Sequence, residues 1–357
     1  MEIPQRPADC ERLWALAAPL DPDGELPRWL PRDAAWYYRR IGDASEIPVD
    51  PAGLAKLDEA RLIWDETGIY LPDPRMPIWS IGIYRGDSLS DLAPVDDRPV
   101  LTRDDVDDVV ATYVADPFLA RDRDTWHMFF EVYNWRANKG EIAVASGDCG
   151  DRWRYRGIVL AEDFHLSYPY VFEHDGEWWM VPETVQAHEV RLYRARSFPH
   201  GWTHVATLLE GDELLDSSLF RHGGRWWLLA AARTRRDDDT LRLYHAARLD
   251  GPWREHPQSP VVAGDPARAR PAGRVLVADD RLVRFAQDCS RAYGEAVRAF
   301  EVTELTAERY AERPLQDGPF LRAGGSGWNA GGMHHVDVQP APDGGFVAAV
   351  DGWTSPP

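Results

Sequence analysis

Three stretches of this sequence repeat one pattern: ADPFLARDRDTWHMFFEV (115–132), SYPYVFEHDGEWWMVPET (167–184) and LDSSLFRHGGRWWLLAAA (215–232). The second residues of these copies are Asp116, Tyr168 and Asp216, which lie 52 and 48 positions apart. Each stands ten residues before a tryptophan: Trp126, Trp178 and Trp226. A fixed period near 50 residues indicates an array of one supersecondary unit.

Two weaker copies follow, ARPAGRVLVADDRLVRFAQD (269–288) and GMHHVDVQPAPDGGFVAAVDG (332–352). Every copy consists of two short apolar runs around a polar turn. This pattern is typical of a β-hairpin. The sequence therefore predicts five related hairpins.

A second kind of segment alternates with the hairpins. One such segment follows each of the first four copies, and the fifth, IGIYRGDSLSDLAPVDDRPVL (81–101), precedes the first copy. Halves split between the two termini are expected in a closed ring, where N-terminal strands complete the last blade. We therefore predict an all-β fold, a five-bladed β-propeller over 79–357, in which 81–84 and 347–350 share a blade. The repeated tryptophans are expected to pack between blades.

Residues 1–78 lack this repeat and are rich in Pro, Leu and Ala. Asp50 can cap a helix, and Pro51 suits the first helical position. We expect a partly helical N-terminal extension with a helix near 51–64.

Composition excludes several classes of function. The net charge is −19 and no basic block occurs, which argues against nucleic-acid binding. No apolar stretch is long enough to span a membrane, and the N-terminus has no signal-peptide pattern. The cysteines are few and scattered, which favours a reducing cytoplasm over a disulfide framework or zinc site: Cys10, Cys149 and Cys289. No cofactor is expected, and no oligomeric state is indicated.

The candidate site lies where the innermost strand of each blade begins, because these ends converge on the propeller axis. The residues there vary while the scaffold repeats: Asp116, Tyr168, Asp216, Arg270 and the pair His334–His335. A varied polar ring at a concave mouth is the expected position of a ligand site.

Two glutamates end apolar runs at one repeat offset, Glu131 in MFFE and Glu183 in MVPE. Each is either a solvent-exposed strand end or a group aimed at the axis, and Pro182 favours the second reading for Glu183. Glycosidic chemistry needs one protonated acid and one ionised carboxylate. Asp116, Glu183 and Asp216 supply such a set, and a third carboxylate would raise the pKa of the acid.

Further candidates for substrate binding carry basic, acidic or aromatic side chains: His165, Arg191, Arg270, Arg274, Asp288, Trp135 and Trp328. Routine ion pairs, structural histidines and core packing are the alternatives for these residues. His334 and His335 are neighbours in a strand and point to opposite faces, so one of them is expected at the axis. No calcium-loop pattern is present, and we predict no metal site.

Eight ordered motifs resemble one known family: VADPF, WHMFFEV, FHLSYPYVF, VPET, ARPAGRV, RFAQD, VRAFEVTEL and GSGWNAGGMHHVD. They resemble the N-terminal propeller domain of plant glucosamine inositolphosphorylceramide transferase and its bacterial relatives, over roughly 81–352. More distantly, the chain is similar to the five-bladed glycosidases, such as arabinanases, β-xylosidases and invertases.

The glycosidase resemblance implies an Asp base or nucleophile in blade one, an Asp in blade two and a Glu acid in blade three. Asp116 matches the first position. Tyr168 stands at the second position and Asp216 at the third, while Glu183 lies at the far end of blade two. In the plant protein, the resemblance implies that glycosyl transfer belongs to a different domain.

These observations favour a glycoside hydrolase-like enzyme acting on a glycan or small molecule. Asp116 would be base or nucleophile, Glu183 the proton donor and Asp216 the residue that tunes the pKa of the donor. A cyclase, lyase or isomerase of bacterial secondary metabolism on the same scaffold is one alternative. A non-catalytic glycan-binding propeller is the other.

Overall fold

The computed structural model describes residues 77–355, except 149, 151, 235, 237, 279 and 280, and the backbone of five short strands nearer the N-terminus. Two compact units divide the chain, Met1–Pro77 with Ser355–Pro357, and Ile78–Thr354. The first unit holds the sheet β1-β2-β3 and the pair β4-β5. Their bounds are β1 (Trp29–Arg32), β2 (Ala35–Arg39), β3 (Glu46–Val49), β4 (Ile63–Asp65) and β5 (Gly68–Tyr70). The helix predicted near 51–64 lies outside the described residues, apart from its last two positions, which belong to β4.

The second unit consists of five antiparallel sheets, the blades, with the orders β11-β10-β9-β8, β12-β13-β14-β15, β16-β17-β18-β19, β21-β22-β23-β24 and β26-β27-β6-β7. Blade 1 comprises β8 (Ala111–Asp122), β9 (Thr125–Asn134), β10 (Lys139–Gly147) and β11 (Trp153–Leu160). Blade 2 comprises β12 (Ser167–His174), β13 (Glu177–Glu183), β14 (Glu189–Ser197) and β15 (His200–Glu210). Blade 3 comprises β16 (Leu214–His222), β17 (Arg225–Ala232), β18 (Thr240–Ala246), β19 (Arg254–Glu255) and β20 (Val262–Ala263).

Blade 4 comprises β21 (Leu276–Ala278), β22 (Arg281–Asp288), β23 (Ala296–Leu305), β24 (Tyr310–Pro314) and β25 (Leu321–Arg322). Blade 5 comprises β26 (Val336–Pro340), β27 (Phe346–Thr354), β6 (Ile78–Gly86) and β7 (Ala93–Pro94). Among the described residues of the propeller, short 3-10 turns connect strands at η2 (Leu89–Asp91), η3 (Arg103–Asp105), η4 (Val185–Ala187) and η5 (Gly327–Asn329). The predicted five-bladed propeller is confirmed.

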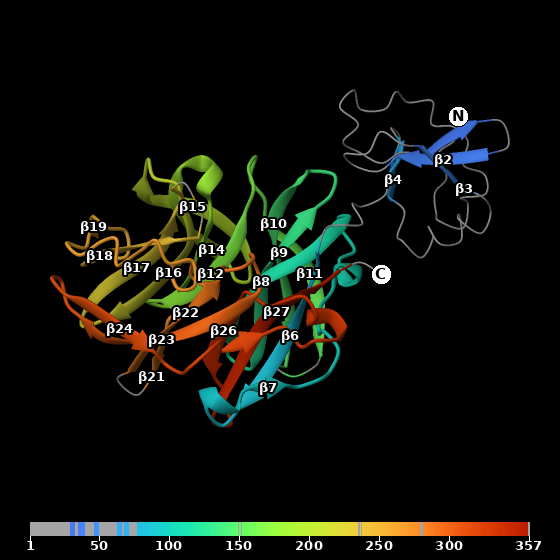
Figure 1. The fold of residues 1–357 in the computed structure, drawn as a ribbon. Coiled ribbons are helices and arrows are strands. Elements are labelled where there is room, and N and C mark those ends of the chain that lie inside the picture. Colours follow the sequence, from blue (N-terminus) through green and yellow to red (C-terminus); the bar gives the residue numbers. More distant parts are fainter. Residues whose placement is uncertain are drawn as a thin grey trace. The chain divides into compact units, whose positions relative to one another are not determined.

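Strands from both ends of the propeller close the ring in blade 5. β6 pairs with β27 in antiparallel register, with Ile83 opposite Ala349 and Gly82 opposite Val350. Figure 1 shows the cyan β6 beside the red β27. The predicted pairing of 81–84 with 347–350 is therefore confirmed. This pairing covers the edges of β27 and β6 that would otherwise be unpaired.

The repeated turns have the geometry that their residues favour. β12 and β13 are joined by Asp175 and Gly176, both with positive φ. β16 and β17 are joined by Gly223 and Gly224, also with positive φ. Two-residue loops of this kind need φ above zero at both positions, which Gly and Asp tolerate best. The residues of these two-residue turns therefore determine the register of the hairpins in blades 2 and 3.

Apolar side chains fill the spaces between neighbouring blades. Ile81 and Val347 of blade 5, for example, join one buried cluster with Met128 and Phe130 of blade 1. Trp126 and Trp226 are buried, and Trp226 packs against Phe172 of the preceding blade, as the repeat predicted. Trp178 differs, because it is half-buried and stacks on Phe198 at 4.0 Å between ring centroids.

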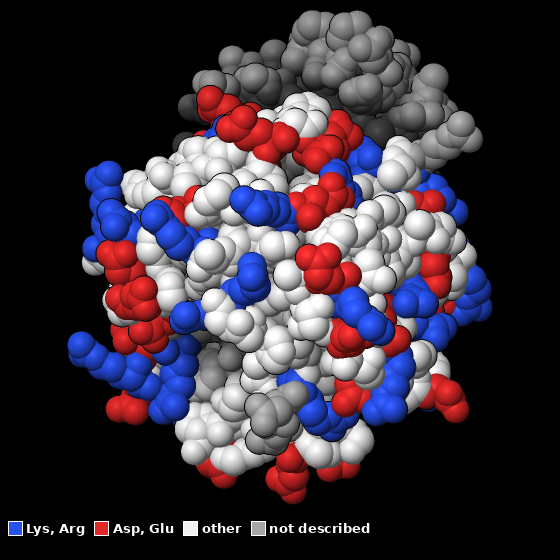
Figure 2. All heavy atoms as spheres, turned by 90° about the vertical axis from the view of Figure 1, so that its left-hand side faces the viewer, with Lys and Arg blue, Asp and Glu red and all other residues white. Residues whose placement is uncertain are grey.

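The outer surface carries charges of both signs. On the face drawn in Figure 2, Lys and Arg side chains are interspersed with Asp and Glu side chains. Across the part of the chain that the structure describes, no helix has the length and apolar character that a membrane span requires.

Candidate active site

The same backbone irregularity starts the inner strand of three blades. Asp116, Tyr168 and Asp216 have φ of 53°, 46° and 52°, in the left-handed region. At each of them the pairing with the next strand shifts register, which defines a β-bulge. A bulge re-aims a side chain that regular pleating would place on a sheet face. The repeat therefore presents equivalent residues of consecutive blades near the axis.

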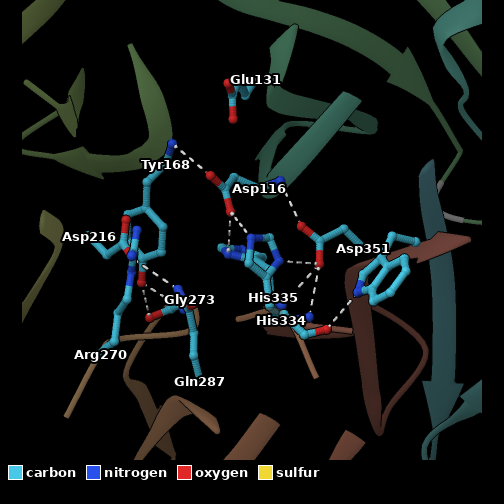
Figure 3. Close-up of polar contacts among 12 residues, drawn as sticks. Asp116, Glu131, Tyr168, Asp216, Arg270, Gly273, Gln287, His334, His335 and Asp351 are labelled. Atoms are coloured by element: carbon cyan, nitrogen blue, oxygen red, sulfur yellow. Dashed lines mark hydrogen bonds and ion pairs between the residues drawn. The ribbon is translucent and has the colours of Figure 1, made fainter. Parts of the chain in front are cut away.

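Five buried carboxyl groups form what we call the acid cluster: Asp116, Glu131, Glu183, Asp216 and Asp351. Each is at most 6% exposed. They come from the inner strands of blades 1 and 3 and from the second strands of blades 1, 2 and 5. Glu131 and Glu183 are therefore buried rather than solvent-exposed strand ends. Figure 3 shows Asp116 between the Tyr168 backbone and the two histidines.

His334 bridges two acids of the cluster. Its Nδ1 lies 2.8 Å from Asp351 Oδ1, and its Nε2 lies 3.7 Å from Asp116 Oδ1. Burial lowers the pKa of His334, but the charges of Asp351 and Asp116 outweigh it, and the net pKa is raised. Burial would raise the pKa of Asp351, but His334 holds it below the usual value. Each partner therefore favours the charged form of the other, and the pair faces Asp116.

Asp351 also fixes the backbone around this pair. Its Oδ1 accepts hydrogen bonds from the backbone amides of His334 (3.3 Å) and His335 (3.0 Å), and its Oδ2 accepts one from the amide of Asp116 (3.0 Å). A carboxylate that accepts several N–H bonds is stabilised in its ionised form. Asp351 thus joins the start of blade 1 to the start of blade 5.

Asp216 is held by two donors from blade 4. Its Oδ2 lies 2.6 Å from Arg270 Nε and accepts a hydrogen bond from Gln287 Nε2 at 2.9 Å. The Arg270 side chain is half-buried, and the neighbouring acids raise the pKa of its guanidinium although burial acts to lower it. The predicted axial arginine therefore neutralises one acid of the cluster. Asp351 has His334 as its basic partner instead.

Burial and mutual repulsion keep protons on several acids. The pKa of Asp116 is raised to about 7, mainly by burial, which the charge of His334 opposes and that of Asp351 reinforces. Burial and then Asp216 raise the pKa of Glu183 well above its usual value. Burial and then Asp116 do the same for Glu131. Like charges in a dry environment cannot all ionise, so this cluster stores protons at neutral pH.

Glu183 has a further distinctive feature. Its Oε2 is buried and has no hydrogen-bond partner among the residues that the structure describes. Glu131, in contrast, accepts a hydrogen bond from the hydroxyl of Tyr113 at 3.1 Å and lies 3.6 Å from Nε2 of His165. An unpaired buried oxygen is costly unless a ligand or water completes it. Glu183 is thus the acid best placed to interact with a substrate.

The side chain of Tyr168 packs beside the acid cluster and has hydrogen-bond partners of its own. We call the residues in such positions the supporting layer. Tyr168 is fully buried, and its hydroxyl contacts Ser218 Oγ (2.8 Å), the Gly273 carbonyl (2.9 Å) and the Gly273 amide (2.6 Å). Its backbone amide donates to Asp116 Oδ2 at 3.2 Å. The structure thus gives this residue, predicted to bind substrate, a supporting position.

His335 also lies beside Asp116, with its Nδ1 3.6 Å from Asp116 Oδ1. Both histidines therefore approach this acid, whereas the strand pattern predicted only one of them at the axis. His335 is fully buried, and burial lowers its pKa to about 4, so its ring is neutral. It packs edge-on against Phe118 at 4.7 Å.

Arg274 lies in the supporting layer. It pairs with Asp337 at 2.8 Å and donates to the Val171 carbonyl at 2.8 Å. Arg274 therefore links blades 2, 4 and 5.

The remaining predicted binding residues are engaged elsewhere. Arg191 pairs with Glu189 and lies over the Phe164 ring. Asp288 pairs with Arg298 at 2.6 Å. Trp135 follows β9 and is half-buried, and Trp328 packs so closely on Gly82 that a Cβ there would be 2.7 Å from it. Two of the further candidates contact the acid cluster: Arg270 through Asp216, and His165 through Glu131.

Sequence reasoning missed three residues of the site: Asp351, Gln287 and Trp79. Trp79 is buried and lies 4.2 Å from the His334 ring, centroid to centroid. Asp351 follows the apolar run FVAAV of the fifth copy, much as Glu131 follows MFF in the first. That shared pattern is a signal by which Asp351 could have been found.

Asp116, His334 and Asp351 place possible metal-ligand atoms within 4.8 Å of one another, in a search confined to the described residues. Both oxygens of Asp351 already accept hydrogen bonds from the protein. We therefore interpret these residues as a hydrogen-bonded triad and assign no metal.

Comparison with known proteins gives one consistent family. A profile described as glucosamine inositolphosphorylceramide transferase 1, N-terminal, matches residues 74–353. Proteins named glucosamine inositolphosphorylceramide transferase 1 are 38% identical over 296 residues in Oryza sativa subsp. japonica and 33% identical over 299 residues in Arabidopsis thaliana. Each alignment covers 77% of this chain. The chain spans 40% and 39% of the length of these relatives.

Solved structures with the same architecture are glycoside hydrolases. An exo-β-1,3-galactanase from Clostridium thermocellum superposes with a TM-score of 0.54 at 12% identity, covering 80% of this chain and 60% of that one. The catalytic domain of a Coprinopsis cinerea α-L-arabinofuranosidase gives 0.50 at 15% identity, covering 68% and 92%. These similarities establish a fold shared with glycoside hydrolases.

Proposed function

This chain belongs to the family of the N-terminal domain of glucosamine inositolphosphorylceramide transferase 1, and we propose that it acts on a glycosidic or glycoside-like bond at its acid cluster. The proposed substrate is a glycan or glycoside, and the proposed chemistry is acid–base catalysis by carboxyl groups. One observation carries the proposal: a buried acid with a raised pKa and an unpaired oxygen, Glu183, lies in one cluster with Asp116.

Glycosidic cleavage needs a proton for the leaving oxygen and a carboxylate for the opposite face of the sugar. Glu183 suits the first role because burial and the neighbouring Asp216 keep it protonated. Asp216, which is ion-paired with Arg270, disfavours the ionised form of Glu183. Asp216 is then a positioning residue.

Asp116 suits the second role. Its pKa of about 7 leaves part of the population ionised at neutral pH, and His334 stabilises that ionised form. As the glycosidic bond breaks, the proton of Glu183 passes to the leaving oxygen. Asp116 either takes the proton of an attacking hydroxyl group or attacks the sugar carbon itself. The attacking group is water in hydrolysis and an alcohol in transfer.

The experiment uses the full chain with a panel of methyl glycosides and natural oligosaccharides, with and without an alcohol acceptor. Products are identified by mass spectrometry. Asp116→Asn and Glu183→Gln should each lower turnover by about 100-fold or more, the scale of lost acid–base assistance. Asp124→Asn is the matched control, because Asp124 is fully exposed in the turn after β8. Undiminished turnover by Glu183→Gln would refute the assignment of the proton donor.

A non-catalytic glycan-binding function is the second candidate. It is favoured by the length relation, since the relatives named as transferases are about two and a half times as long as the matched region. In that case the panel would contain ligands that bind but are not converted. Wild-type binding without products would therefore support this candidate and overturn the catalytic one.

A further inference from the structure

Tyr293 is an exposed aromatic residue directly beside the acid cluster. It lies in the connection between β22 and β23 of blade 4, and 49% of its surface is exposed. Single exposed apolar side chains are common on proteins and need no function. Tyr293 differs from these because its ring contacts two residues that hold acids of the cluster.

Those contacts involve Arg270 and His334. The guanidinium carbon of Arg270 lies 5.0 Å from the centroid of the Tyr293 ring. The His334 ring lies 5.1 Å from it at an interplanar angle of 84°, an edge-to-face arrangement. Arg270 holds Asp216, and His334 faces Asp116. The tyrosine ring therefore lies beside both functional halves of the cluster.

The position of Tyr293 is fixed by its neighbour Gly294. The Gly294 carbonyl accepts a hydrogen bond from Trp353 Nε1 at 2.9 Å. Its φ is +74°, and a Cβ there would lie 2.6 Å from the ring of Trp79. The ring centroids of Trp79 and Tyr293 are 6.3 Å apart. An exposed aromatic ring is thus held in one place by packing against blade 5, which lowers the entropy cost of binding a ligand on it.

The charges of the acid cluster act on the Tyr293 hydroxyl. Partial burial raises its pKa, Arg270 lowers it, and Asp116, Asp216 and Asp351 raise it again. No hydrogen bond of this hydroxyl occurs within the described residues of the propeller. It has a free donor and acceptor for a ligand.

We infer that Tyr293 contacts the substrate of this site and contributes to its specificity. An aromatic ring packs against the apolar C–H face of a sugar, and the hydroxyl offers a hydrogen bond to one of its hydroxyl groups. The substrate class is therefore a glycoside whose sugar ring exposes such a face. This inference rests on the proposed function, because it places the glycan at the same cluster.

The test compares Tyr293→Phe, Tyr293→Leu and Tyr293→Ala in the full chain. KM and kcat are measured on the best substrate of the glycoside panel, and the affinity for the matching methyl glycoside is measured by NMR titration. Loss of the ring in the Leu and Ala variants should raise KM and Kd about tenfold. The Phe variant should raise them about two- to tenfold, the range of one lost hydrogen bond. The change in kcat should stay within about twofold, because the acids are untouched.

Val277→Ala is the control, since Val277 is also exposed, at 46%, but lies on β21. Unchanged KM and Kd in Tyr293→Ala, with an unchanged melting temperature, would overturn the inference. Failure of the proposed function gives a different result. In that case Asp116→Asn and Glu183→Gln keep their turnover, or no substrate is converted, while Tyr293→Ala still weakens binding of the methyl glycoside.

Discussion

Replacing Asp116 with Asn should stabilise the protein at alkaline pH. The pKa of Asp116 rises from 3.8 to about 7 in the folded chain, mainly through burial. Such an acid binds its proton more tightly when folded than when unfolded. Its contribution to stability is therefore complete below pH about 4 and is lost as the pH rises to about 7. At about 1.4 kcal/mol per pH unit, the whole loss is about 4 kcal/mol.

Asparagine cannot ionise, so the variant avoids this loss. Roughly half of it, about 2 kcal/mol, falls between pH 5.5 and 8.5. The side-chain oxygen of Asn can still accept the hydrogen bond that the Tyr168 backbone amide donates to Asp116 Oδ2 at 3.2 Å. Urea unfolding of both proteins at the two pH values measures the difference. Between pH 5.5 and 8.5, the free energy of unfolding of the variant should rise by about 2 kcal/mol relative to that of the wild type.

Asp124→Asn serves as the control, because its fully exposed carboxylate should give no gain with pH. A gap between wild type and Asp116→Asn that is equal at both pH values would show that Asp116 is ionised throughout. The same result would remove the argument that the acid cluster stores protons.

Two further predictions concern packing and the histidine. Trp226→Ala should lower the free energy of unfolding by about 3–5 kcal/mol, because Trp226 is buried between blades. Trp178→Ala should lower it by less, because Trp178 is half-buried. Urea unfolding measures both. Glycan affinity per folded molecule should stay unchanged in both variants, and lost binding at full stability would reverse these roles. Asp351→Asn should lower the pKa of His334 below its usual 6.5, because burial then acts with less opposition. NMR titration of His334 measures this, and an unchanged pKa would contradict the assigned triad.

The fold could be predicted from the sequence because the blades repeat the residues that specify it, strongly in blades 1 to 3 and more weakly in blades 4 and 5. The tryptophan spacing and the turns such as Asp175–Gly176 recur at the same offsets, and each is satisfied within or between adjacent blades. The split of the repeats between the termini then determines closure by β6 and β27. Local chemistry and global topology agree, which is the condition for such a prediction to succeed.

The candidate site could be predicted from the sequence only in part, because the repeat does not determine where the side chain at a β-bulge points. Asp116, Glu183 and Asp216 could be found as acids at recurring offsets. Tyr168 shares the repeat offset of Asp116 and Asp216 but ends in the supporting layer, since its hydroxyl contacts a carbonyl group of another blade. Such partners are set by how blades pack, and no motif in one blade indicates them.

The bulge explains how one scaffold produces different axial chemistry. A left-handed backbone is tolerated by Asp, which suits blades 1 and 3, but it is strained for a bulky Tyr. In blade 2 this strain, on the order of 1–3 kcal/mol, is offset by complete burial and by three hydrogen-bond contacts of the Tyr168 hydroxyl. The same bulge turns the Tyr168 amide toward the Asp116 carboxylate. Blade 2 therefore positions the acid that blade 1 supplies, while its far end contributes Glu183.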